Sequence, residues 1–246
     1  MLAKNDISSM ISMGMKVAGF IKTSLLDWDG NIVSTVYLSG CNFRCPFCHN
    51  PDLVGGVADD EQIEWSQVEE FLRENRDFLD GVVVSGGEPT LHPDLLAMLK
   101  SIKALGLKVK LDSNGTRPDV LDDLIGAGLI DFVAMDIKAP LDHRYDQLCG
   151  IEGQADKVRA SVKVVIGSGV DHEFRTTVVP IMLKEEDIED IARSLKGAKR
   201  YVLQQFRPKV TLDPNLGALD PYPVSVIRKM SKTAGEHVNN VRVRGI

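Results

Sequence analysis

The sequence predicts an α/β fold in which helices cover a parallel sheet. Short apolar stretches, several of them rich in β-branched residues, alternate with stretches of helical spacing along the chain. Strands that alternate with helices are typical of βαβ units, whose strands run parallel. The 246 residues, 43% of them hydrophobic, suffice for one substantial core, and no low-complexity linker divides them. We therefore expect a single domain.

Six strands are predicted from short apolar runs bounded by turn-forming residues. The first leads directly into a segment that contains three cysteines, and the second is followed by two glycines. In chain order, the predicted strands cover residues 32–38, 81–84, 107–111, 132–137, 173–179 and 201–206. Residues 241–243 are a candidate for a further strand.

Helices are predicted between these strands because apolar residues recur there at intervals of three and four. In residues 93–105, for example, Leu95, Leu99 and Ile102 lie on one face, and Gly106 is a typical residue for a helix end. The other predicted helices cover residues 61–79, 118–125, 155–166, 185–195 and 223–237.

Composition excludes several classes of protein. The net charge of −6 does not favour a nucleic-acid partner. No apolar run approaches the ~20 residues that span a bilayer, so we expect no membrane partner. The first 20 residues lack the continuous apolar block of a secretory signal. We therefore expect a cytoplasmic protein with reduced cysteines.

Three cysteines lie within eight residues: Cys41, Cys45 and Cys48. A [4Fe-4S] cluster held by three thiolates leaves one iron free to bind a small molecule. A zinc site with His49 as fourth ligand is an alternative, although structural zinc sites usually take a second ligand pair far along the chain. The softness of three thiolates favours iron and sulfur. Cys149 stands alone, and we expect it to be a buried packing residue.

Polar residues follow the predicted strands where each strand ends. The carboxyl ends of parallel strands meet at one edge of a sheet, so these residues should lie together beside the cysteines. Taken singly, each group also fits an ordinary turn or a salt bridge. The groups are Ser85 to Pro89, Asp112 to Gly115, Asp136 with Lys138, Arg175 to Thr177, and Gln204 to Arg207.

The order of these motifs resembles the radical S-adenosylmethionine (SAM) superfamily over about residues 17–207. Within it, residues 40–52, 111–116 and 135–138 are similar to the glycyl-radical-enzyme activases, above all those of anaerobic ribonucleoside-triphosphate reductase. The resemblance implies a partial (β/α)6 barrel of parallel strands with outer helices. Residues 208–246 would form a C-terminal extension of helix and strand.

The resemblance also implies one [4Fe-4S] cluster and one bound SAM. No further cysteines stand between the cluster loop and the second strand, so a second cluster is not expected. The iron ligands would be Cys41, Cys45 and Cys48. Phe47 would pack on the adenine. The methionine amino group would be held by Gly86, Gly87 and Glu88.

The remaining SAM contacts are implied at the ends of later strands. The ribose and carboxylate side would be lined by Asp112, Ser113 and Asn114. Lys138 would pair with the methionine carboxylate, and Arg207 would lie near the ribose. A monovalent cation is expected between Asp112 and Asp136.

The activity implied is reductive cleavage of SAM to a 5′-deoxyadenosyl radical. In an activase this radical takes a hydrogen atom from a glycine of a partner enzyme, such as anaerobic ribonucleoside-triphosphate reductase. A reduced flavodoxin or ferredoxin would supply the electron. Because a fold does not fix the substrate, a radical SAM enzyme acting on a small molecule, RNA or another peptide is the alternative. A zinc-binding scaffold that has lost its chemistry is disfavoured by the intact set of strand-end residues.

Overall fold

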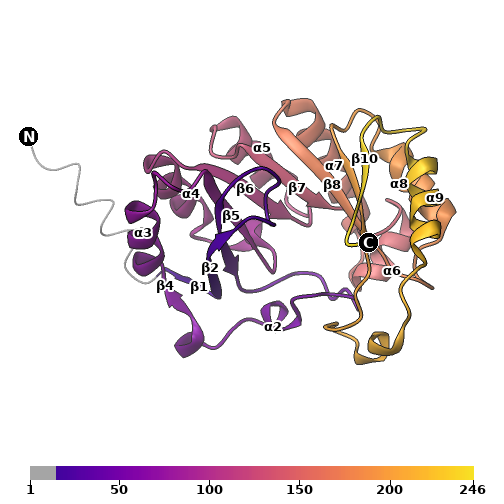
Figure 1. Cartoon of the computed structure of the whole chain (residues 1–246), viewed down its shortest axis with the longest axis horizontal. Helices are drawn as coiled ribbons and strands as arrows, with labels where there is room; N and C mark the ends of the chain where they lie inside the picture. Colours follow the sequence, from indigo (N-terminus) through magenta and orange to yellow (C-terminus); the bar gives the residue numbers. More distant parts are fainter. Residues whose placement is uncertain (1–14) are drawn as a thin grey trace, which may run out of the picture.

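The computed structural model describes residues 15–246, and its centre is a sheet of eight strands (Figure 1). The order is β10-β9-β8-β7-β6-β5-β3-β2, and every neighbouring pair is parallel except β2 with β3. The strands are β2 (Gly19–Ser24), β3 (Val33–Leu38), β5 (Gly81–Gly86), β6 (Lys108–Ser113), β7 (Phe132–Asp136), β8 (Asp171–Val178), β9 (Tyr201–Gln205) and β10 (Val241–Arg244). The predicted parallel sheet is confirmed, with the six predicted strands and the candidate at 241–243.

Helices follow the parallel strands and lie around the outside of the sheet in Figure 1. They bury their apolar residues against the outward side chains of the strands, in one continuous core. The helices are α2 (Pro51–Val54), α3 (Trp65–Glu74), α4 (Leu95–Ala104), α5 (Pro118–Gly126), α6 (His143–Cys149), α7 (Gln154–Ser168), α8 (Glu185–Ser194) and α9 (Val224–Ala234).

Some boundaries differ from the sequence prediction for local reasons. The helix predicted over residues 61–79 is shorter, because Ile63–Glu64 forms a strand, β4, that pairs with β1 (Lys16–Val17). Helix α6 was not predicted, since its seven residues are too few to show a helical period. Strand β2 was also missed, and it extends the sheet by pairing antiparallel with β3.

The two faces of the sheet have different chemistry. In β6, Val109 and Leu111 belong to the core beneath the helices, whereas the side chain of Lys110 bonds to the backbone carbonyl of Asp27 inside the sheet's curve. Side chains alternate between faces along a strand, so Asp112 shares the inner face with Lys110. The inner face therefore carries charged side chains, beside a small apolar cluster of Trp28, Val33, Val83, Phe132 and Ala134.

The segment between β2 and β3, residues 25–32, crosses the inner side of the sheet. Trp28 from this segment packs on Phe132, with ring centroids 5.6 Å apart. Asp29 accepts hydrogen bonds from Arg242 and Arg244 of β10 at 3.5 and 3.4 Å. Since β2 and β10 stand at opposite ends of the strand order, the sheet must curl toward itself, as a partial barrel does. We call residues 25–32 the strap.

The prediction that the first 20 residues carry no secretory signal concerns mainly residues 1–14, which lie outside the described residues. From residue 15 onward, none of the helices combines the length and the apolar character needed to cross a membrane. The C-terminal segment contributes β10 to the main sheet beside β9.

Candidate active site

The three clustered cysteines lie on a loop that follows β3. Backbone bonds fix this loop against residues 53–54: Gly40 donates to the Leu53 carbonyl at 2.7 Å, and Cys41 to that of Val54 at 3.3 Å. A turn bond from Cys48 to Cys45, 3.0 Å, brings the last two cysteines together. All three are free thiols. Burial raises the pKa of Cys41 to about 11, so the metal-free thiol is protonated near neutral pH.

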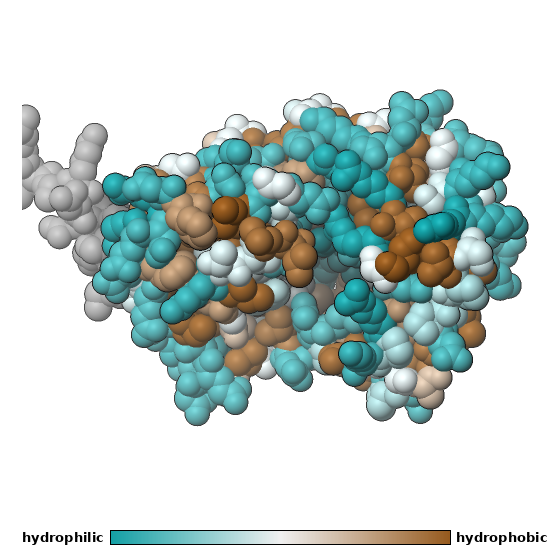
Figure 2. Space-filling model, in the orientation of Figure 1, coloured by the Kyte–Doolittle hydropathy of each residue, from teal (hydrophilic) through white to brown (hydrophobic). Residues whose placement is uncertain are grey.

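These cysteines line a cavity of about 440 Å³ at the carboxyl ends of the parallel strands. The face between β2 and the C-terminal strand is hollowed near its centre, with hydrophobic residues on both sides (Figure 2). Most residues predicted from the sequence line the same cavity. They are Cys41, Cys45, Cys48, Phe47, Gly86, Gly87, Asp112, Ser113, Asn114, Asp136 and Lys138.

Two glycines let the end of β5 lie directly on the cysteine loop. Gly87 donates to the Leu38 carbonyl and Glu88 to the Gly40 carbonyl, both at 2.8 Å. Gly86 has a φ of +126°, which other residues rarely adopt. A Cβ atom on Gly87 would overlap the carbonyl oxygen of Gly40. The glycines are therefore required by the contact between two backbone segments.

We expect Gly87→Ala to destabilise the protein by about 2 kcal/mol, because the added methyl group must displace the cysteine loop. Gly55→Ala is the matched control, since Gly55 has a φ of −83° and open space at its Cβ position. Urea unfolding of the two variants measures the difference. Equal midpoints for both variants would contradict the proposed steric role of Gly87.

The side chain of Glu88 lies beside the cavity. It is 1% exposed and does not line the cavity. One carboxylate oxygen accepts from the Ser113 hydroxyl at 2.9 Å and from Thr90, and the other accepts from the backbone amide of Asn114 at 2.6 Å. Burial raises the pKa of Glu88, and these hydrogen bonds oppose that rise. The carboxylate therefore joins β5 to β6, and a contact of Glu88 with the methionine amino group stays a prediction.

Charged side chains form a connected network on the inner face. Arg175 donates to Asp136 at 2.8 Å and to Asp112 at 3.2 Å, and Lys138 pairs with Asp136 at 2.8 Å. Burial alone would raise the pKa of Asp136, but the two cations outweigh it and hold the pKa well below its usual range. The guanidinium of Arg175 thus joins the two carboxylates between which a monovalent cation was expected, and that cation stays a prediction.

Two polar atoms show how the site is prepared for a ligand. The Oδ1 atom of Asp112 is buried at the cavity and makes no hydrogen bond among the described residues, although it forms an ion pair with the Nζ of Lys110 at 3.7 Å. Lys138 lies over the ring of Phe47, with its Nζ 5.9 Å from the centroid. The Oδ1 atom can therefore still accept a hydrogen bond from a bound donor.

Asn114 connects the end of β6 to the cysteine loop. Its side-chain amide donates to Asn42 at 2.8 Å and lies 4.0 Å from the sulfur of Cys41. Its carbonyl oxygen accepts from the Thr116 amide at 3.0 Å and hydroxyl at 2.8 Å, which fixes the orientation of the amide. Asn42 was not singled out from the sequence, because a residue between two cysteines carries no motif of its own.

Arg207 was expected at the site, but it is exposed and does not line the cavity. Phe206, just before it, is fully buried, and the residues that follow contact the outside of the cysteine loop, where Asp213 donates to the Pro46 carbonyl at 2.9 Å. Gln204 is the residue of β9 that lines the cavity. Gln204 and Arg207 are both polar, so residue type alone does not distinguish them. Gln204 lies within β9, whereas Arg207 lies two residues beyond its end.

Other lining residues were missed or left unassigned. Arg175 and Thr177 were noted as polar strand-end residues without a role, and both line the cavity. Tyr37 and Asp27 were not considered. The alternation along β3 could have placed Tyr37 on the inner face, but Asp27 belongs to the strap, which has no periodic pattern. Burial, with the nearby carboxylates of Asp27 and Asp112, raises the pKa of Tyr37.

The zinc alternative finds no support in the position of His49. Its Nδ1 atom lies 3.3 Å from the Val210 carbonyl oxygen, and its ring packs near that of Phe206. Zinc would draw its ligand atoms to about 2.0–2.3 Å from one point. In the part of the chain that the structure describes, no three Cys, His, Asp or Glu side chains meet as ligands of a single ion.

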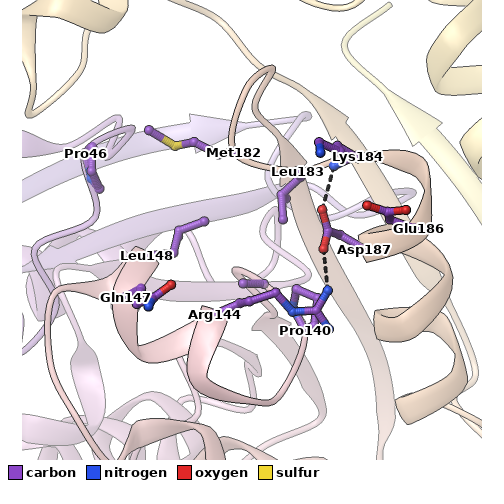
Figure 3. A pocket seen from close by; sticks show the side chains of 11 residues that line it. Pro46, Pro140, Arg144, Gln147, Leu148, Met182, Leu183, Lys184, Glu186 and Asp187 are labelled. Atoms are coloured by element: carbon purple, nitrogen blue, oxygen red, sulfur yellow. Dashed lines mark hydrogen bonds and ion pairs between the residues drawn. The ribbon is translucent and has the colours of Figure 1, made fainter.

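A second cavity, of about 500 Å³, lies between α6 and the segment before α8 (Figure 3). Two of its charged groups, Arg144 and Asp187, are already paired with each other. Arg144 donates to Asp187 at 2.7 Å, and Asp187 accepts from the Lys184 backbone amide at 2.8 Å. Arg144 also pairs with Asp142 and Asp190. The central cation and carboxylate of the second cavity are therefore occupied by each other.

Comparisons with known proteins agree with this geometry. The sequence profile described as Radical SAM superfamily matches residues 35–197. A putative glycyl-radical enzyme activating enzyme of Methanocaldococcus jannaschii is 35% identical, over 94% of this chain and 96% of its own. The pyruvate formate-lyase-activating enzyme of Clostridium pasteurianum is 28% identical, over 78% of this chain and 80% of its own.

A solved structure shares the fold. Streptococcus suis SuiB bound to precursor peptide SuiA has a TM-score of 0.68, at 16% identity, and the match covers 87% of this chain and 48% of SuiB.

Proposed function

This chain belongs to the radical SAM superfamily, and from that premise we propose that it is a glycyl-radical-enzyme activating enzyme. Its cofactors are a [4Fe-4S] cluster and SAM, and its activity is the cleavage of SAM to generate a radical. The proposal concerns the next step, removal of a hydrogen atom from a glycine Cα of a partner enzyme. The observation that carries it is the 35% identity to an activating enzyme over nearly the whole length of both chains.

The residues present fit the cluster. Three thiols of one loop line one cavity, and none forms a disulfide. We propose that Cys41, Cys45 and Cys48 ligate three irons and leave the fourth for SAM. Held by these cysteines and reduced, such a cluster would supply the electron for the cleavage of SAM to methionine and a 5′-deoxyadenosyl radical.

The residues around the cysteines fit SAM as well. The backbone of Gly86 and Gly87 borders the cavity without side chains, which lets a ligand approach closely. Lys138 offers a cation to a carboxylate, and the Oδ1 of Asp112, which is ion-paired with Lys110 but accepts no hydrogen bond among the described residues, offers an acceptor to a hydroxyl or ammonium group. Phe47 provides an apolar surface beside Lys138 for the adenine. We propose that these residues hold and orient SAM.

We propose that the cavity also receives part of a second reactant. It continues to Tyr37 and Asp27, whose side chains are not needed by the cysteine loop. Glycine is the target that demands least space, since its Cα carries no side chain. We propose that a glycine-containing loop of the partner enters the cavity, and that Arg175, fixed by two carboxylates, keeps the inner face ordered during the reaction.

Among possible partners we propose anaerobic ribonucleoside-triphosphate reductase. Residues 40–52, 111–116 and 135–138 resemble the glycyl-radical-enzyme activases, and among those the support is the resemblance of the chain to the activating proteins of that reductase. We further propose a reduced flavodoxin or ferredoxin as electron donor, because the chain has no cysteines for a second cluster. A cytoplasmic location would suit the free thiols.

The test mixes the reduced, cluster-loaded protein with SAM and the glycyl-radical enzyme of the same organism under anaerobic conditions. We expect 5′-deoxyadenosine to form together with a glycyl radical signal in electron paramagnetic resonance. The control is the same partner with its radical glycine replaced by alanine, which should give no such signal. Formation of 5′-deoxyadenosine without a radical on the partner would reject the activase proposal and favour another substrate.

A further inference from the structure

Three polar side chains form a closed ring of hydrogen bonds beside the cysteine loop. The side-chain nitrogen of Asn114 donates to the side-chain oxygen of Asn42 at 2.8 Å, and the side-chain nitrogen of Asn42 donates to the Thr116 hydroxyl at 3.0 Å. The Thr116 hydroxyl donates to the side-chain oxygen of Asn114 at 2.8 Å, which closes the ring. Asn42 comes from the cysteine loop, whereas its two partners follow β6. The ring therefore joins residues that are 72 and 74 positions apart in the chain.

One backbone group fixes the orientation of both amides in the ring. The Thr116 backbone N–H can only donate, and it lies 3.0 Å from the side-chain amide of Asn114. The atom that it meets must be the oxygen, so the nitrogen of Asn114 faces Asn42, and the nitrogen of Asn42 faces the Thr116 hydroxyl. Asn114 is 6% exposed and Thr116 is 2% exposed, so water competes little for these bonds. Each bond in such a ring polarises the next, which holds the amide of Asn114 in one orientation.

The ring leaves one N–H group of Asn114 unused. A side-chain amide carries two N–H groups, and Asn42 accepts from only one of them. The same nitrogen donates to the sulfur of Cys41, with 4.0 Å between the two atoms. That sulfur also accepts from the backbone amide of Phe43 at 3.4 Å. The ring thus directs an N–H group at one of the three thiols that we assign to the cluster.

We propose that the ring of Asn42, Asn114 and Thr116 holds an N–H group on the sulfur of a cluster ligand, and that this hydrogen bond raises the reduction potential of the cluster. Reduction adds negative charge to the cluster and its sulfur ligands. A donor to one sulfur stabilises the reduced form more than the oxidised form, and such hydrogen bonds are among the determinants of cluster potentials. The three ring members are positioning residues, because they act through Cys41. The inference rests on the cluster and is independent of the identity of the partner.

The experiment is a redox titration of the cluster-loaded protein, followed by electron paramagnetic resonance, with neither SAM nor a partner present. We expect Asn114→Ala to lower the ratio of reduced to oxidised cluster at a fixed applied potential by about threefold, or about 28 mV at 59 mV per tenfold change. Thr116→Val should give a smaller shift in the same direction, because it removes the hydroxyl but keeps the backbone donor to Asn114. Thr116→Ser keeps the hydroxyl and should have the potential of the unaltered protein.

Ser161→Ala is the matched control. Ser161 is fully buried, and its hydroxyl donates to the Gly115 carbonyl at 2.7 Å, one residue from Thr116 and outside the ring. Its loss disturbs the same turn but leaves the ring intact, so the potential should not change. The double variant Asn114→Ala/Thr116→Val is a further control. Because Thr116 acts through Asn114, the valine should add no shift to that of the alanine.

Three results would overturn the inference. The first is an Asn114→Ala protein with an intact cluster and an unchanged potential. The second is a shift in Ser161→Ala as large as in Thr116→Val, which would assign the effect to the turn. The third is a shift from Thr116→Val that persists in full beside Asn114→Ala. If Asn114→Ala does not keep its cluster, the comparison of Thr116→Val with Thr116→Ser and Ser161→Ala decides alone. Since the titration contains no partner, these results are separate from the test of the activase proposal.

Discussion

Replacing any one of Cys41, Cys45 or Cys48 by alanine is expected to abolish both the iron–sulfur cluster and the cleavage of SAM. Each of these thiols lines the cavity, and the cluster requires all three to keep a single open iron. Iron and sulfide analysis, absorbance and the yield of 5′-deoxyadenosine measure the loss. Cys149→Ala should retain four irons per chain, because Cys149 is the buried last residue of α6 and does not line the cavity.

Because three of the four cysteine variants should lose the cluster and one should keep it, the comparison distinguishes ligands from other cysteines. Normal production of 5′-deoxyadenosine by Cys45→Ala would exclude the proposed ligand set. Loss of the 5′-deoxyadenosine with retention of the full cluster would assign Cys45 to binding SAM instead.

Glu88→Ala is expected to have the largest effect on stability of any single change at the site. It removes the acceptor for two backbone amides and two hydroxyls, all of them buried, at the junction of β5 and β6. Each unsatisfied buried donor costs about 1–3 kcal/mol, so we expect a loss of about 3 kcal/mol or more. For a chain of this size that lowers the melting temperature by about 6–12 °C. Differential scanning calorimetry of the cluster-free protein measures the change.

Two variants serve as controls for this prediction. Glu88→Gln keeps one side-chain oxygen and should lie between the alanine variant and the unaltered protein. Glu152→Ala removes an exposed carboxylate and should change stability by no more than about 0.5 kcal/mol. A Glu88→Ala protein as stable as Glu152→Ala would mean that the carboxylate does not hold the two strand ends together.

Much of the site follows from one rule, that parallel strands end at the same edge of a sheet. From the sequence alone, that rule predicts that the cysteine loop, Gly87, Asp112 and Lys138 lie together, and they line one cavity. It could not decide which atoms meet. The carboxylate of Glu88 looked available from the sequence, because its partners Ser113 and Asn114 come from another strand.

The missed elements share a physical cause, the absence of a repeating pattern. Helix α6 has only seven residues, and the strap has none of the periodicity that identifies a helix or a strand. Both nevertheless reach the site, α6 through Cys149 and the strap through Asp27. Arg175 differs, because side chains alternate between the two faces along β8. The polar residues Glu173, Arg175 and Thr177 therefore share one face, and this pattern could have placed Arg175 on the inner face.

The hydrogen bonds from Arg242 and Arg244 to Asp29 join residues 213 and 215 positions apart. During translation, the strap leaves the ribosome long before the last strand is made. The contact that joins the two ends of the sheet can therefore form only after β10 has been made, and closing so long a loop is intrinsically slow. Until then, the nascent chain carries its three thiols on a sheet that is still missing one edge.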